Sequence, residues 1–234
     1  MASNKLQADN WIARHILIIG IAAIGVWLFL ESRAQWSPMH RWNRAVGDMS
    51  LVLVAAAMAL GPLSRLWRPV ARVLLFRREL GIYGVVLAAV HTAIILLGWV
   101  ELDLMRLFGF EFHPGLQRYV MVQHGFALAN AVGIFALLYG LVLAATSNDA
   151  SMRLLGNGVW KFVQQGTYVL WWLAVAHTVY FLFVHFVDFH RQTPEPNWAQ
   201  WPFVTLVLLV TGLQIAATFK TWRRTRNGGR TSPA

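Results

Sequence analysis

The sequence predicts an all-α integral membrane protein, a single domain over residues 1–234 that forms a bundle of six transmembrane helices. Hydrophobic residues make up 57% of the chain and charged residues only 13%, which is about half the charged share of a soluble domain. The apolar residues form long runs, and about 20 such residues cross a bilayer as a helix. Most of the 12 tryptophans lie where an apolar run meets a polar loop, as in the aromatic belts of membrane proteins.

The apolar runs can be taken in order along the chain. The first resembles a signal peptide in length, but the later topology requires it as a retained helix. An arginine-rich segment (64–79) precedes the third run and is expected to lie at the membrane interface as a short amphipathic helix. No internal repeat is evident. The expected spans are about 14–31, 48–64, 80–100, 118–145, 160–187 and 200–220, followed by a basic disordered tail over 221–234.

The distribution of charge predicts the orientation in the membrane. Arginine and lysine concentrate in the 64–79 segment and the C-terminal tail, whereas the 101–114 and 188–197 loops are slightly acidic. Because cytoplasmic loops carry the excess of Lys and Arg, both termini are expected in the cytoplasm. The first outer loop is an exception, since Arg33, Arg41 and Arg44 outnumber Glu31. We therefore attribute the net charge of +10 to topology and lipid contact, not to nucleic acid.

Several kinds of chemistry are excluded or unsupported by the sequence. The chain has no cysteine, which excludes disulfides, cysteine-ligated iron–sulfur clusters and covalent c-type haem attachment. It contains no GxGxxG or Walker A motif, so no nucleotide site is predicted. No catalytic triad is recognisable, and whether the chain is itself an enzyme is left open. Any metal or haem must be held by histidine, methionine or oxygen ligands.

Two of the eight histidines, His91 and His177, lie deep in the third and fifth predicted spans. An ionisable side chain inside a membrane is costly and is therefore a candidate functional residue. Their depths differ by less than about 10 Å at 1.5 Å per helical residue, and Gly84 and Ala88 on the face of His91 leave room for a large flat group. They are expected to be the axial ligands of one haem iron. The alternative is two unrelated histidines, each hydrogen-bonded to a backbone carbonyl or a hydroxyl.

Two further histidines, His124 and His185, are expected nearer the outer surface, on the fourth and fifth spans. They are candidates for the ligands of a second haem or for the lining of a quinone site. The alternative is that both are interfacial histidines without a cofactor. The remaining four histidines are expected to be solvated or interfacial, because they lie in loops or at helix ends.

Two blocks of sequence carry a known pattern. The first is the run Arg77-Arg78-Glu79-Leu80-Gly81, which leads through apolar residues to His91. The second is Thr146-Ser147, followed by Leu155-Gly156 and by Trp160 at the start of the fifth span. Together they resemble the ferric-reductase-like transmembrane domains, and among these the MsrQ (YedZ) family of haem-binding membrane subunits. The resemblance covers roughly residues 45–190.

The resemblance implies a b-type haem with His91 and His177 as axial ligands, in an electron-relay subunit of a bacterial inner membrane. It implies a quinol or a flavin reductase as electron donor, with FMN or quinone as a further cofactor. The acceptor would be a separate redox protein at the outer, periplasmic face, which for MsrQ is a methionine sulfoxide reductase. The family has another histidine early in the fifth helix, where this chain has Gln164 or Gln165. Either one haem site is lost, or His124 and His185 build a different one.

Two other classes of protein remain as alternatives. The first is a cofactor-free membrane scaffold or assembly subunit of a larger complex, whose histidines only pack and form hydrogen bonds. The second is a transporter, which usually needs charged groups at mid-membrane and often carries inverted repeats. No acidic residue is expected deep within a span, so transport is the least favoured interpretation.

Overall fold

The computed structural model describes residues 2–122, 125–185 and 197–228. Within these ranges six helical segments are long and apolar enough to cross a membrane, which confirms the predicted bundle. They are α1 (Ala2–Glu31), α2 (Pro38–Leu66), α3 (Arg77–Ile94) with the π-helical turn η2 (Ile95–Trp99), α5 (Phe126–Thr146), α6 (Asp149–Gln165) leading into α7 (Thr167–Val179) with the π-helical turn η3 (Tyr180–Val184), and α8 (Gln200–Gly228).

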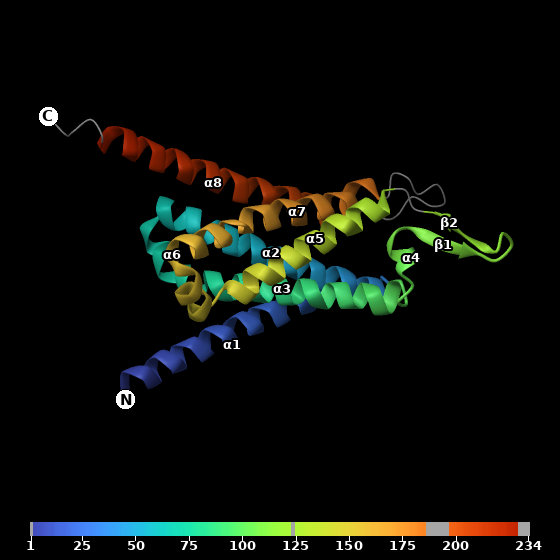
Figure 1. Cartoon of the computed structure of the whole chain (residues 1–234), viewed down its shortest axis with the longest axis horizontal. Helices are drawn as coiled ribbons and strands as arrows, with labels where there is room; N and C mark the ends of the chain where they lie inside the picture. The colour runs from blue at the N-terminus through green and yellow to red at the C-terminus, as the bar shows by residue number, and fades with distance from the viewer. Residues whose placement is uncertain (1, 123–124, 186–196, 229–234) are drawn as a thin grey trace.

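Helix α2 lies at the centre of the bundle and contacts α1, α3, α7 and α8. Its alanine-rich middle explains this position, because small side chains let neighbouring helices approach closely on several sides. Leu53, Ala55 and Met58 of α2 are almost fully buried. Helix α5 packs against α3 and α7, while α1 and α8 lie along opposite outer edges (Figure 1). The four helices α2, α3, α5 and α7 therefore share one interior.

The two ends of the bundle differ in structure and charge (Figure 1). At one end α4 (Leu104–Leu107) leads into a hairpin of β1 (Phe110–His113) and β2 (Arg118–Met121), which projects beyond the helices. We call this the hairpin end. At the other end the 3₁₀-helix η1 (Arg68–Phe76) joins α2 to α3 beside the last turns of α8. We call this the basic end.

The fourth span begins later than the predicted residue 118. Residues 118–121 form the strand β2, which pairs antiparallel with β1, with Phe110 opposite Met121 and His113 opposite Arg118. Gly109, at φ 84°, precedes β1, and Gln117, at φ 51°, lies in the turn between the two strands. A left-handed glycine, Gly125 at φ 77°, then precedes the first residue of α5. The apolar residues of β2 were assigned to the helix because their hydrophobicity alone does not distinguish a short strand from a helix end.

The fifth span and the tail also differ from the expectation. Helix begins at Asp149 and not at residue 160, with a break at Gly156, whose φ of 75° and ψ of 154° are not helical. The predicted disordered tail begins too early, because α8 continues through residue 228. Arg223 stacks on Phe219 at 4.3 Å, and the next i, i+4 pair is Arg226 over Trp222. Such pairs stabilise helical turns even outside a packed core.

Candidate functional site

A cavity of about 800 Å³ lies between α2, α3, α5 and α7. This volume is in the range of small-molecule and cofactor sites. Toward the basic end its walls are apolar and include Val54, Val85 and Leu170. Toward the hairpin end polar side chains join the lining. These include His40, Arg44, Asp48, His185 and Asn197. Both predicted haem ligands, His91 and His177, line the cavity between its apolar and polar halves.

His91 projects from α3 and is oriented by α2. Its Nδ1 lies 2.9 Å from the backbone oxygen of Asn43. A carbonyl oxygen can only accept, so Nδ1 carries the hydrogen and donates it. The ring lies directly on Gly47, where a β-carbon would come within 2.9 Å of Nδ1. Glycine is needed at position 47 so that the imidazole can reach the carbonyl one turn earlier on the same helix.

His177 projects from α7 and is oriented by α5 in the same way. Its Nδ1 donates to the backbone oxygen of Ala129 at 2.8 Å. Here the ring lies on Gly133, where a β-carbon would come within 2.6 Å of Nδ1. The hydrogen bonds to carbonyls that were the alternative to ligation are therefore present. They use only Nδ1, and no described residue bonds the Nε2 of either ring, so each histidine keeps a nitrogen that can bind a metal.

These two arrangements form an internal repeat that the sequence analysis missed. Each histidine lies 48 residues after the residue whose carbonyl it binds. The short motif is Ala-Ala-Val-His-Thr at 88–92 and Ala-Val-Ala-His-Thr at 174–178. In both copies the threonine hydroxyl bonds the carbonyl four residues earlier, and a π-helical turn follows. π-helical turns inside α-helices are frequent at functional sites.

The two rings lie close together. Their centroids are 6.5 Å apart and their planes are at 87°. A metal held by one nitrogen of each ring at about 2.0–2.1 Å, as in zinc–imidazole bonds, would place the centroids about 6 Å apart. Within the described residues no three His, Cys, Asp or Glu side chains are grouped to hold a metal ion. The donor set of two histidines, each with a second-shell carbonyl, therefore fits a metal whose other ligands come from a planar macrocycle.

The other two predicted site residues are His185 and His124. His185 lines the cavity at the hairpin end, with its ring 5.6 Å from that of Phe126 and 5.7 Å from that of Phe181. His124 lies outside the described residues. The role of both histidines in a second haem or a quinone site stays a prediction.

Gln164, which stands where the resemblance leads us to expect a histidine, is occupied elsewhere. Its Nε2 donates to the Thr146 hydroxyl at 3.0 Å and to the Leu143 carbonyl at 3.3 Å, and its Oε1 accepts from the Ser147 hydroxyl at 3.2 Å. It holds the turn between α5 and α6 and does not line the cavity. The neighbouring Gln165 is exposed.

The polar half of the cavity contains Arg44, which was expected in an outer loop, and Asp48, the first residue of the predicted second span. Arg44 lines the cavity from α2, and Asp48 lies one turn later on the same helix. Asp48 accepts a hydrogen bond from Arg33, whose side chain is only 1% exposed. The Arg33 guanidinium is 5.0 Å from the ring of Trp198. The spacing of Arg44 and Asp48, four residues apart at the start of an apolar run, was the available signal.

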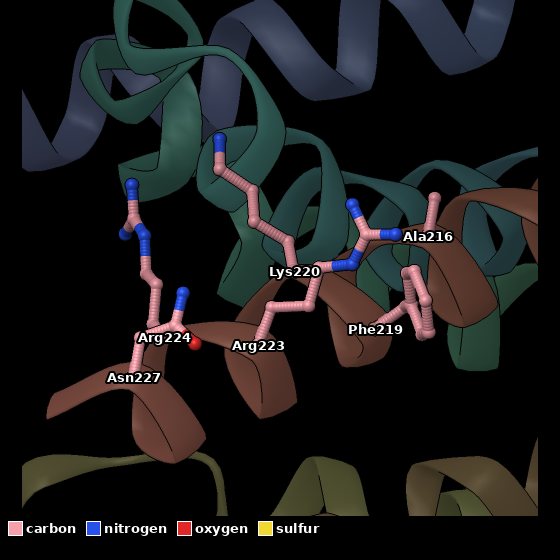
Figure 2. A pocket seen from close by; sticks show the side chains of 6 residues that line it. All are labelled: Ala216, Phe219, Lys220, Arg223, Arg224 and Asn227. Atoms are coloured by element: carbon pink, nitrogen blue, oxygen red, sulfur yellow. The ribbon is translucent and has the colours of Figure 1, made fainter. Parts of the chain in front are cut away.

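A second hollow, of about 490 Å³, lies at the basic end, on α8 (Figure 2). Lys220, Arg223 and Arg224 line it together with the apolar side chains of Ala216 and Phe219. The Lys220 ammonium binds the carbonyls of residues 65 and 66 at the end of α2, at 2.9 and 3.1 Å. Lysine at a helix C-terminus is favoured by the helix dipole. This contact ties α8 to α2 at the end that carries most of the basic residues.

Two imidazoles thus lie 6.5 Å apart, each oriented by a backbone carbonyl, in a cavity between four helices of a membrane bundle. The chain belongs to the ferric reductase like transmembrane component family, which matches residues 45–175, more than half of the sequence. This confirms the family resemblance. The match covers α3, α5 and most of α2 and α7, the helices that surround the cavity.

Curated relatives extend the similarity beyond this region. The chain is 27% identical over 214 residues to the protein-methionine-sulfoxide reductase heme-binding subunit MsrQ of Bordetella parapertussis, covering 89% of both chains. The subunit of the same name from Bordetella bronchiseptica matches to the same extent. The subunit of that name from Ralstonia nicotianae is 29% identical over 149 residues, covering 60% of this chain and 58% of that one.

Proposed function

We propose that this chain binds one haem b between His91 and His177 and relays electrons within a membrane. The observation that carries the proposal is the pair of imidazoles 6.5 Å apart, each with its Nδ1 fixed by a backbone carbonyl. The name of the MsrQ relatives, heme-binding subunits, supports it. The absence of cysteine excludes covalent attachment as in c-type cytochromes, and the family resemblance implies that the non-covalently bound haem is of b type. When bound, the haem supplies one-electron redox chemistry.

The protein's part in this chemistry is to hold and isolate the cofactor. The carbonyls of Asn43 and Ala129 fix the ring orientation of His91 and His177 and raise their basicity as ligands. The apolar walls exclude water, which favours electron transfer without side reactions. If His91 and His177 both bound the iron, no coordination position would be left open for oxygen. The chain is thus proposed to act as an electron-transfer subunit and not as a self-contained enzyme.

The proposed direction of transfer follows from the two ends of the bundle. The positive-inside rule assigns the basic end, with both termini, to the cytoplasm of a bacterial inner membrane. His91 lies eight residues, or about 12 Å, from the end of η2 at Trp99 and 14 residues, or about 21 Å, from the start of α3. The cofactor would therefore lie nearer the hairpin end. Electrons would enter from a quinol or a flavin reductase and leave to a periplasmic redox partner, for which the relatives' name suggests a methionine sulfoxide reductase.

The experiment is a dithionite-reduced minus oxidised visible spectrum of the full chain purified in detergent, with pyridine haemochrome quantification. We expect b-type bands and about one haem per chain, because the described residues offer one bis-histidine pair. Replacing His91 or His177 by Ala should abolish or strongly reduce haem content. The matched control is His15→Ala, because His15 also lies in a membrane helix but binds Tyr83, at 2.9 Å, and lies outside the cavity.

A flat spectrum from protein expressed with ample haem would overturn the proposal. So would wild-type haem content in both the His91→Ala and His177→Ala variants. In either case the cofactor-free scaffold would become the leading interpretation. Two haems per chain would overturn the proposed count but not the site.

A further inference from the structure

The polar half of the cavity holds more positive than negative charge. Arg33 and Arg44 both interact electrostatically with the carboxylate of Asp48. Arg33 and Arg44 interact with no other described acidic side chain, so the three groups together carry a net charge of +1. Burying an unbalanced charge in an apolar bundle costs several kcal/mol. The imbalance is therefore expected to serve a ligand of opposite charge.

Of the two arginines in this group, Arg44 lines the cavity and Arg33 does not. The Nη2 of Arg44 donates to the carbonyl of Phe181 at a long 3.3 Å, and no other hydrogen bond links it to a described residue. Arg33, in contrast, is enclosed by the rings of Phe29, Trp36 and Trp198, at 5.0–6.0 Å, and is already paired with Asp48. A guanidinium has five N–H donors, so most of the donors of Arg44 remain available to a ligand in the cavity.

Arg44 also lies next to both histidine supports. It follows Asn43, whose carbonyl binds His91. Its own acceptor, Phe181, lies one turn after His177 and its ring is 4.9 Å from the His177 ring. A flat group held between His91 and His177 would thus reach Arg44 at its edge.

The internal repeat shows that this charge is not required for helix packing. The position equivalent to Arg44 in the second copy is Asn130, just as Ala129 is equivalent to Asn43. Asn130 donates to the carbonyl of Leu107 at 2.7 Å and carries no charge. The same helix pair is therefore built once with a cation and once without.

A second unsatisfied donor lies in the same half of the cavity. Asn197 is 6% exposed and lines the cavity, and its Nδ2 has no hydrogen-bond partner among the residues that the structure describes. Its Oδ1 is used by the backbone N–H of Ala199 at 3.1 Å, which fixes the amide so that Nδ2 is the free group. A buried donor left without a partner costs about 1–3 kcal/mol, so it too indicates an acceptor in the cavity.

We propose that Arg44, assisted by Asn197, binds an ionised carboxylate side chain of the cofactor held by His91 and His177. This inference rests on the proposed haem site and adds the group that fixes the rotation of the haem about its axial bonds. Asp48 and Arg33 act as positioning residues. Because Arg33 occupies the Asp48 carboxylate, Asp48 does not fully neutralise Arg44, which keeps its charge for the ligand.

The test is a double-mutant cycle in which one change is made in the protein and the other in the ligand. Full-length protein, expressed under haem limitation and purified in detergent, is titrated with haemin and with haemin dimethyl ester, which lacks the carboxylate charges. We expect the ester to bind the wild-type protein about tenfold more weakly, as for the loss of a charge-assisted hydrogen bond. In Arg44→Gln the ester and the acid should bind within about threefold of each other.

Two variants control for folding and charge. Arg44→Lys keeps the charge and should keep most of the ester penalty. Arg41→Gln removes a neighbouring arginine on α2 that binds the carbonyl of Leu30 and lies outside the cavity, and it should behave as wild type. The midpoint potential of the Arg44→Gln holoprotein should be lower than that of wild type, because a fixed positive charge near the iron favours the ferrous state.

An equal ester penalty in wild type and Arg44→Gln would overturn the carboxylate site. So would equal affinities of the wild-type protein for haemin and for its dimethyl ester. This second result does not depend on whether Arg44→Gln folds. Neither result would affect the haem site itself, which fails only if His91 and His177 prove dispensable for haem binding.

Discussion

The glycine beneath each histidine offers a sharp test of the site, and Gly133 is the more demanding of the two. A β-carbon at position 133 would lie 2.6 Å from the Nδ1 of His177. Non-bonded carbon contacts are comfortable at about 3.5–4.0 Å, so Gly133→Ala requires the ring to move by about 1 Å. Ala129 lies one turn before Gly133 on α5, so a movement of the ring away from position 133 would also lengthen its bond to the Ala129 carbonyl, now 2.8 Å.

The expected result is a loss of haem affinity without loss of the fold. Removing a second-shell partner of a metal-bound histidine typically costs 10–100-fold in affinity, and we expect Gly133→Ala to fall in this range. Gly47→Ala should cost less, because its β-carbon would lie 2.9 Å from His91. Both are measured by haemin titration of the full chain, with the thermal stability of the haem-free protein as the readout of folding.

Matched controls are available within the same bundle. Gly81 of α3 and Gly212 of α8 have open space where a β-carbon would be. Alanine there should leave haem binding unchanged and raise stability by up to about 1 kcal/mol through helix propensity. Wild-type haem affinity in Gly133→Ala would refute the view that the imidazole position is set by contact with α5. An equal loss in Gly81→Ala would show that the assay reports general packing.

Two further predictions concern residues away from the histidine pair. Gln164→His should not add a second haem, because position 164 faces the α5–α6 turn and not the cavity. The haem-to-protein ratio should stay the same. The melting temperature should fall, because the hydrogen bonds to Leu143 and Thr146 are lost. Asp48→Asn should destabilise the protein by about 3 kcal/mol, because it leaves Arg33 buried without its acid. This is measured by reversible unfolding in mixed micelles, with Asp149→Asn, which breaks an exposed ion pair, as a control that should have little effect.

Much of the fold was predictable because it depends on the length and composition of single segments. Runs long enough to cross a bilayer have one stable solution in lipid, the helix, and all six were found in this way. The errors concern short segments whose structure depends on local backbone conformation and pairing. Residues 118–121 pair with β1 through backbone hydrogen bonds, and Gly125 then delays the helix. The apolar side chains of residues 118–121 indicate neither this pairing nor the later start of the helix.

His91 and His177 were predictable for a different reason. A histidine in an apolar run is costly, so its presence alone indicates a role. The groups that orient the two rings were not predictable, because they are backbone carbonyls on other helices, 48 residues earlier in the chain. Every residue has a carbonyl, so the sequence does not mark which ones are used. Gly47 and Gly133 are informative only once the helix pairs are known.

The repeat explains both what the sequence could have revealed and what it could not. The shared Ala-x-x-His-Thr motif marks the two helices that carry His91 and His177, and it is present in the sequence at 88–92 and 174–178. Both copies have a close contact between a glycine on one helix and a larger residue on the other. Gly84 of α3 faces Val54 of α2, whereas in the second copy Gly140 of α5 faces Leu170 of α7. The small and large partners have changed sides, so identity by position is lost while the helix spacing is kept.

The two copies of the repeat differ in their charged residues, and under the proposed carboxylate site this difference would set the orientation of the cofactor. The paired helices by themselves would hold a flat cofactor equally well in more than one rotation about its axial ligands. Arg44 occurs in one copy only, toward the hairpin end, and its counterpart Asn130 is already bonded to Leu107. A carboxylate-bearing cofactor would therefore be bound in one rotation, with its charged edge toward the hairpin end. The orientation of the cofactor would thus depend on a pair of equivalent positions, Arg44 and Asn130, at which the two halves differ in charge.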